Sequence, residues 1–181
     1  GYSRPVLSPR GQLLGEVGDG NRKDIRNAVE AAHAAARAWS TSTGHLRAQI
    51  LFYIGENLDA RRGEFAGRLA AMTGGTAIDG RREVDAAVQR LFTYAAWADK
   101  WDGAVHSVPI RGVALAMHEP IGVVGAAAPD TAPLLGFVSV VAPLIATGNT
   151  VVAVPSESRP LSATDLYQVF ETSDLPGGVV N

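Results

Sequence analysis

The chain has 181 residues, of which 46% are apolar and 19% are charged, and its 16 Lys and Arg against 18 Asp and Glu give a formal net charge of −2. The apolar content excludes a disordered chain, and the balanced charge favours neither nucleic acid nor an anionic membrane as a partner. The sequence has no cysteine, which excludes disulfides, thiolate zinc sites and a catalytic thiol within it. It has no uninterrupted apolar run of membrane-spanning length and no apolar signal region, so we expect a cytoplasmic protein.

The first half of the chain predicts an arm followed by helices. Residues 1–20 are punctuated by prolines and glycines, which predicts an extended arm. Residues 21–101 carry apolar side chains at helical spacing and predict a segment of four amphipathic helices. Asn21 and Asp24 have the spacing of a capping box at the start of the first helix, and Gly74 is expected to end the third.

The second half predicts a hairpin and then part of a parallel sheet. Residues 102–119 alternate weakly around a proline and a glycine, which predicts a hairpin. The elements expected after it are a strand at 121–128 buried on both faces, a helix from Pro133 to Gly148, a strand at 150–154, a helix at 161–172 and a strand beginning at Val179. This order is half of a doubly wound α/β sheet, so residues 120–181 are expected to form the first, truncated part of a Rossmann-like cofactor-binding domain.

The two strand-to-helix turns of this sheet are candidate binding sites, because free N–H groups at a helix N-terminus point into the crevice there. The first turn, residues 128–133, contains no glycine, so a classical phosphate-binding fingerprint is absent. It is either a cofactor turn or a turn made rigid by prolines that holds no ligand. In the second turn, residues 154–158, Glu157 could accept hydrogen bonds from a ribose. Alternatively, Glu157 lies in the first turn of the next helix or caps it.

Other reactive residue types give no further site. The chain has no G-x-S-x-G motif, and no metal site is predicted because no ligand spacing relates its histidines, which are His33, His45, His106 and His118. Acidic pairs on the helices are expected to lie on solvated faces; they are Glu56 with Glu64 and Asp79 with Glu83. The tryptophans are expected to anchor the core, namely Trp39, Trp97 and Trp101.

Several segments resemble the N-terminal half of NAD(P)-dependent aldehyde dehydrogenases. They are AVEAAHAAARAW, LRAQILFYIGENLDARRGEFAGRLAAMTGG, EVDAAVQRLFTYAAWADK, EPIGVVG, and GNTVV followed by PSE, and they run in order over nearly the whole chain. The resemblance implies an aldehyde-dehydrogenase-like α/β fold in which the helical segment packs on a Rossmann-like domain and the hairpin joins an oligomerisation sheet. The partner implied is a second copy of the chain or the rest of a longer parent chain.

The resemblance also implies a parent that oxidises an aldehyde to a carboxylic acid with NAD or NADP. The catalytic cysteine and glutamate of the family would lie beyond Asn181, so the 181-residue chain alone is expected to be inactive. Thr131 stands where the family's Pro-Trp-Asn-Phe-Pro motif has its oxyanion-stabilising asparagine. A threonine hydroxyl is shorter than an amide, and Asp130 beside it places negative charge where negative charge develops.

The cofactor motif of the family, Val-Val-x-Lys-Pro-x-Glu, corresponds to residues 151–157. Glu157 is kept, but Val154 replaces the lysine and cannot donate a hydrogen bond to a ribose or phosphate, so cofactor binding is expected to be weakened or absent. The candidate cofactor-binding residues of the two turns are Ala128, Pro129, Val154, Pro155, Ser156 and Glu157.

These departures resemble the second module of the double-module (family 16) aldehyde dehydrogenases, which is not expected to catalyse by itself. Two hypotheses follow: the chain is a fragment of an aldehyde-oxidising enzyme, or it is a non-catalytic structural or assembly module related to such enzymes. A sheet that stops after its third strand leaves an unpaired apolar edge, so a dimer or higher oligomer is expected.

Overall fold

The protein is described here by a computed structural model that covers residues 2–181. Its strands and helices, in chain order, are β1 (Tyr2–Leu7), β2 (Leu13–Asp19), α1 (Arg22–Ser40), α2 (Gly44–Ala60), α3 (Arg62–Thr73), α4 (Ala77–Ala98), β3 (Ala104–Ser107), β4 (Val113–Ala116), β5 (Val123–Ala127), α5 (Pro133–Ala146), β6 (Thr150–Val154) and α6 (Leu161–Thr172). Within this part of the chain, none of the helices is long and apolar enough to cross a membrane.

The expected arm is an antiparallel hairpin of β1 and β2, with Tyr2 opposite Asp19 at its open end. Val6 is its one buried apolar side chain in the core. The hairpin is tied to the body by Arg68 of α3, whose guanidinium donates to the carbonyl of Leu14 at 3.3 Å. This hydrogen bond anchors the arm on the helical segment.

The helices begin and end where local side chains satisfy their free backbone groups. The capping box of Asn21 and Asp24 is confirmed at the start of α1. Gly74 ends α3 in the left-handed conformation, with φ of 73°, as expected for a glycine at that position. A second capping box, Thr76 with Asp79, is found at the start of α4.

Only one of the three tryptophans anchors the core, so the expectation for the other two was wrong. Trp39 is 3% exposed, and its indole N–H donates to the carbonyl of Ile145 at 3.1 Å. Trp97 and Trp101 are 55% and 56% exposed. Trp97 lies about 100° around α4 from the buried Ala98, and Trp101 follows the end of that helix, so neither ring faces the core.

The parallel sheet is present, with β5 beside β6 in a register that pairs Val123 with Thr150. Val151 of β6 also bridges to Val180 in parallel, so the expected third strand begins at the far side of β6. The prediction that β5 is buried on both faces was wrong, because Gly125 and Ala127 are exposed. Within the described residues β5 has a strand neighbour on one side only, which leaves its other edge uncovered.

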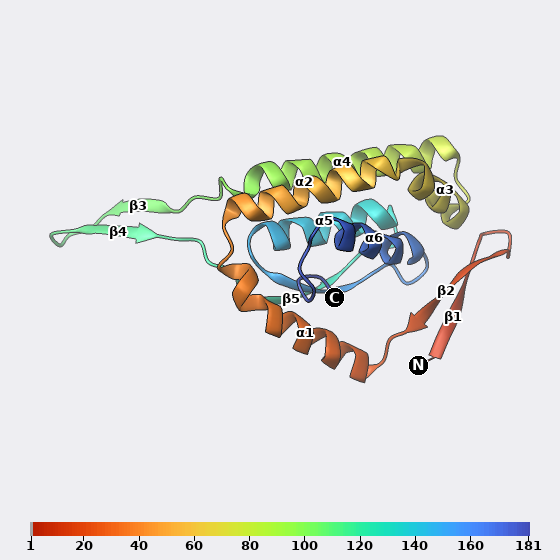
Figure 1. Cartoon of the computed structure of the whole chain (residues 1–181), viewed down its shortest axis with the longest axis horizontal. Coiled ribbons are helices and arrows are strands. Elements are labelled where there is room, and N and C mark those ends of the chain that lie inside the picture. Colours follow the sequence, from red (N-terminus) through yellow and green to blue (C-terminus); the bar gives the residue numbers. More distant parts are fainter. Residues whose placement is uncertain (1) are drawn as a thin grey trace.

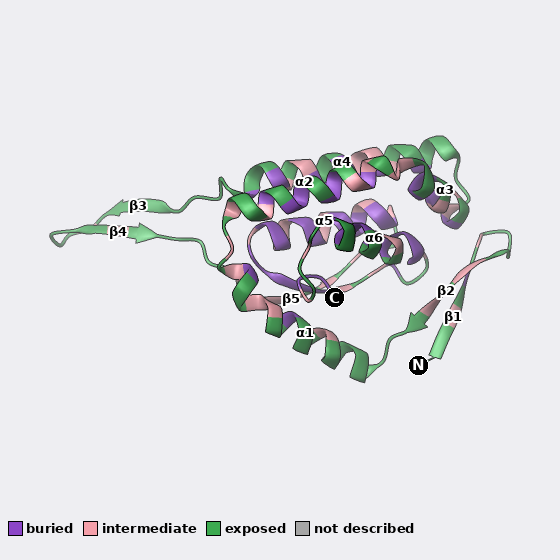
Figure 2. Cartoon of the chain, in the orientation of Figure 1, coloured by how far each residue is buried: buried purple, intermediate pink, exposed green. Residues whose placement is uncertain are grey.

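The elements form layers around this sheet (Figure 1). Helix α1 contacts β5 and β6 from one face, α5 packs against the same strands, and α6 contacts α5. Above α5 and α6 lie α2, α3 and α4, and the buried residues concentrate between these two helical layers (Figure 2). The architecture is the mixed α/β class expected from the sequence.

The hairpin of β3 and β4 projects away from the layers (Figure 1). Its strands pair antiparallel from Ala104 opposite Ala116 to Ser107 opposite Val113. Apolar side chains on it are open to solvent, with Val105 73% and Leu115 64% exposed. The hairpin was predicted at this place, and its apolar surface has no partner within residues 2–181.

Candidate functional site

The two candidate turns lie side by side at the carboxyl edge of the parallel sheet. Ala127 ends β5 directly opposite Val154, which ends β6. The N–H of Ala128 then donates to the carbonyl of Val154 at 2.8 Å, which holds the starts of the two turns together. This is the edge at which open α/β sheets bind their ligands.

A network of side chains that the sequence did not predict joins the two turns. One carboxylate oxygen of Asp130 accepts from the Ser156 hydroxyl at 2.6 Å, from the Ser158 hydroxyl at 3.1 Å and from the Ser158 N–H at 3.4 Å. We name Asp130, Ser156 and Ser158 the Asp130 clasp. The hydrogen bond from Ser156, then those from Ser158, lower the pKa of Asp130 below its ordinary value, so this carboxyl is ionised at neutral pH.

Arg159 supports the clasp from the second turn. Its N–H donates to the Ser156 hydroxyl oxygen at 3.0 Å, and its guanidinium donates to the carbonyl of Asp130 at 3.3 Å. The guanidinium thus bonds to backbone of the first turn. The signal in the sequence that could have predicted this network is the order of the strands. Successive parallel strands bring the polar residues of adjacent turns together at one edge of the sheet.

The N-terminus of α5 is capped by a carboxylate from another helix. Glu83 of α4 accepts from the N–H of Leu134 at 2.8 Å and from that of Leu135 at 3.2 Å. The expectation of a solvated face was wrong for Glu83, which is half-buried against α5. Its negative charge is well placed at the positive end of the helix dipole, and it occupies the N–H groups that an anionic ligand would use.

The predicted catalytic candidate, Thr131, is exposed in the first turn, and its hydroxyl makes none of the hydrogen bonds found among residues 2–181. Ala132 follows it as the residue before α5, in a left-handed conformation with φ of 50°. The strained backbone therefore comes one residue after Thr131, at a position where a side chain other than glycine is uncommon.

The predicted cofactor residues of the second turn are brought together, but they offer few polar groups. Val154 is 50% exposed, whereas Ser156 is 2% exposed and committed to the clasp. Glu157 is exposed, and its backbone carbonyl accepts from Arg4 of β1 at 2.5 Å. Helix α6 begins later, at Leu161, without a side-chain cap, so Glu157 is neither a first-turn residue nor a cap.

The residues of this edge do not fit the adenosine half of a dinucleotide. A ribose would find one free carboxylate, Glu157, and beside it the apolar side chain of Val154 in place of a donor. The N–H groups at the start of α5 are already satisfied by Glu83. Ser156 donates to Asp130 and accepts from the Arg159 N–H, so its hydroxyl is used in both directions.

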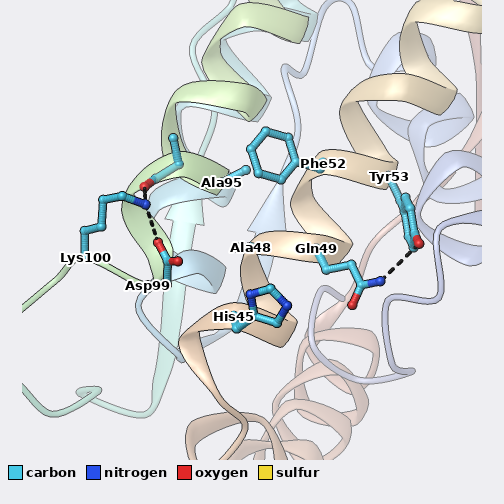
Figure 3. Close-up of a pocket in the computed structure, with 9 residues that line it drawn as sticks. His45, Ala48, Gln49, Phe52, Tyr53, Ala95, Asp99 and Lys100 are labelled. Carbon is cyan, nitrogen blue, oxygen red and sulfur yellow. Dashed lines mark hydrogen bonds and ion pairs between the residues drawn. The ribbon is translucent and has the colours of Figure 1, made fainter.

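A separate groove of about 400 Å³ lies between α2 and α4, away from the sheet edge (Figure 3). Its polar side chains bond to one another: Lys100 contacts Asp99 at 2.7 Å, and the Gln49 amide donates to the Tyr53 hydroxyl at 3.1 Å. The groove is open, and these four polar side chains are paired without a ligand. Within residues 2–181 no three histidine or carboxylate side chains gather to hold a metal ion.

Comparison with known proteins places these features in a family. The model of the aldehyde dehydrogenase family matches residues 3–181. Betaine aldehyde dehydrogenase from Staphylococcus aureus, solved with NAD+, is 28% identical with a TM-score of 0.95. PnpE from Pseudomonas sp. WBC-3 is 30% identical with a TM-score of 0.96, and a structure of PnpE holds nicotinamide adenine dinucleotide. An NADP-dependent enzyme of E. coli is 25% identical with a TM-score of 0.97.

Each of these matches covers 99% of this chain but only 37% or 38% of the matched protein. The chain therefore spans just over a third of the length of the proteins it resembles. The part it corresponds to is the N-terminal part of their fold.

Proposed function

Since this chain belongs to the aldehyde dehydrogenase family, we propose that it is the N-terminal part of an aldehyde-dehydrogenase module that does not catalyse, within a parent protein that oxidises aldehydes to carboxylic acids with NAD(P)+. Such a module corresponds to the second module of the double-module (family 16) enzymes. The parent's chemistry then takes place at another site, and this module contributes structure and assembly surface.

The observation that carries the proposal is the Asp130 clasp, which lies next to the position of the family's oxyanion-stabilising asparagine. The exposed Thr131 stands at that position, and the residue beside it carries an ionised carboxylate. Loss of one well-placed oxyanion donor costs about 3 kcal/mol of activation free energy. Val154 also replaces a residue that would bind the cofactor. The residues of this edge therefore weaken both oxyanion stabilisation and cofactor binding.

The other hypothesis, that the chain is a fragment of a module that itself oxidises an aldehyde, is favoured by Glu157. This carboxylate is exposed beside the end of β6 and could accept a ribose hydroxyl. Its retention supports cofactor binding, but one acceptor is weaker support than the combined effect of Asp130, Thr131 and Val154.

The test uses the intact protein that contains this chain. Calorimetric titration with NAD+ gives the number of cofactor sites, and absorbance at 340 nm follows NADH production from a panel of aldehydes. We expect NADH from at least one aldehyde, and one cofactor site fewer than the number of aldehyde dehydrogenase modules per chain. A site count equal to the module count would contradict the non-catalytic assignment. Absence of NADH with every aldehyde would contradict the assignment of the parent.

The module is further proposed to act in a cytoplasmic homo-oligomer or on the rest of its parent chain. The exposed apolar residues of the β3–β4 hairpin and the free edge of β5 support a protein partner.

A further inference from the structure

We propose that the Asp130 clasp closes the crevice between the two turns to NAD(P)+, so that Asp130 is the residue that excludes the dinucleotide from this module. The inference rests on the proposed function. It explains the loss of cofactor binding by a group that blocks the site, whereas the replacement at Val154 only removes a contact. Val154 removes one attractive contact. The clasp instead joins the two turns through hydrogen bonds between groups of the protein itself.

The clasp consumes the polar groups that a ribose would need. Three donors of the second turn converge on one oxygen of Asp130, at 2.6, 3.1 and 3.4 Å. The Ser156 hydroxyl is buried and already makes two hydrogen bonds. A ligand could accept a hydrogen bond from these serine hydroxyls only after displacing the carboxylate, which would leave the ionised oxygen without its partners.

The charges around the clasp also oppose a ligand that carries two phosphates. The Asp130 carboxylate is ionised at neutral pH, and Glu83 adds a second carboxylate at the start of α5. The guanidinium of Arg159, which contacts the clasp, donates to the Asp130 carbonyl. Negative charge at the mouth of the crevice is therefore only partly balanced.

The crevice is held shut by partners on both sides of the second turn. The clasp bonds this turn to the end of β5, while Arg4 of the N-terminal hairpin bonds to the Glu157 carbonyl on the other side. The N–H of Ala128 donates to the Val154 carbonyl below the clasp. Separating the two turns thus requires the Asp130 carboxylate to leave the serines and the Arg159 guanidinium to leave the Asp130 carbonyl, and the carboxylate makes more of these bonds.

The experiment compares NAD+ binding by variants of the intact protein in calorimetry. Val154→Lys restores the family's donor, and Asp130→Ala in the same protein removes the clasp. We expect the double variant to gain a cofactor site with at least tenfold higher affinity than Val154→Lys alone. Asp174→Asn combined with Val154→Lys is the matched control, because Asp174 is exposed at the other end of α6 and its left-handed backbone suits asparagine.

Asp130→Asn with Val154→Lys gives a second measurement, because the amide keeps an acceptor for the serines but removes the charge. We expect an affinity between those of Val154→Lys and the alanine double variant. Circular dichroism checks that each variant folds, and if Asp130→Ala does not, the asparagine variant carries the test. Equal affinities of Val154→Lys and the folded double variants would overturn the inference. Equal affinities would leave the proposed function standing, whereas binding of NAD+ to this module in the unmodified protein would contradict both the proposed function and the exclusion by Asp130.

Discussion

At the scale of single residues, two carboxylates take roles that their own sequence surroundings do not indicate, because their partners lie far away in the chain. Glu83 caps a helix that begins about fifty residues later, and Asp130 bonds to serines more than twenty residues on. Neither partner is visible from the local sequence. Thr131, by contrast, is exposed as its polar side chain in a turn would suggest.

We predict that Glu83→Ala lowers the free energy of unfolding by about 1–2 kcal/mol, because the N–H groups of Leu134 and Leu135 lose their acceptor. Glu83→Gln keeps an acceptor oxygen, so it should cost only about 0.5 kcal/mol of unfolding free energy. This cost is the lost interaction between the negative charge and the dipole of α5. Urea denaturation measures both. Glu56→Ala, at an exposed position of α2, is the control and should change stability by less than about 0.5 kcal/mol.

The pH dependence of stability should reveal the Asp130 clasp. The pKa of Asp130 is lower in the folded than in the unfolded chain, so its contribution is complete above the ordinary aspartate pKa of about 3.9 and is lost as the pH falls through the folded value. We expect wild type to be more stable than Asp130→Asn at pH 7, and the difference to shrink as the pH falls below about 4. Urea titrations at several pH values give this difference. If the difference in unfolding free energy does not change with pH, the serines do not stabilise the charged form of Asp130, and the prediction is wrong.

At the scale of elements, the ends of a helix are determined by residues close in sequence, whereas the contact between two helices depends on residues that are distant in sequence. The capping boxes at Asn21 and Thr76 involve residues three apart and could be recognised from spacing alone. The crossing of α3 and α4 depends on Gly80, which brings α4 against the backbone of Ala66. The sequence shows a glycine at position 80 but does not show that the backbone of Ala66 lies too close for a larger residue.

We predict opposite effects for two helical glycines replaced by alanine. A Cβ at Gly80 would lie 2.3 Å from the Ala66 carbonyl oxygen, so Gly80→Ala must push α3 and α4 apart and should cost about 2 kcal/mol of unfolding free energy. Gly67 of α3 faces open space, so Gly67→Ala should stabilise the protein by up to about 1 kcal/mol through helix propensity. Thermal and urea unfolding measure both changes. If Gly80→Ala were as stable as wild type, the close contact of the two helices would be wrong.

At the scale of the whole molecule, the chain leaves two surfaces uncovered. The β3–β4 hairpin exposes apolar side chains on strands that project from the body (Figure 2). The edge of β5 lacks a neighbouring strand within the described residues, and Ile121 just before it is 88% exposed. Large exposed apolar surface of this kind is typical of protein interfaces.

We predict that Val105→Lys with Leu115→Glu lowers the oligomeric state of the intact protein, as measured by light scattering after gel filtration. The two residues are cross-strand partners, so opposite charges preserve the hairpin while making its surface polar. Ile78→Lys changes an equally exposed apolar residue at the start of α4 and should leave the mass unchanged. An unmodified protein that is monomeric would contradict the oligomer expected here.

The sequence by itself determined the elements, the α/β class and the family, because helix caps, apolar periodicity and strand order act over short distances or are repeated along the chain. The tertiary structure decided which side chains meet: Trp39 is buried whereas Trp97 and Trp101 are exposed, and Glu83 leaves its expected solvated face to cap α5. It also decided that the candidate turns are joined by Asp130. These outcomes depend on contacts between distant segments, which spacing along one chain does not encode.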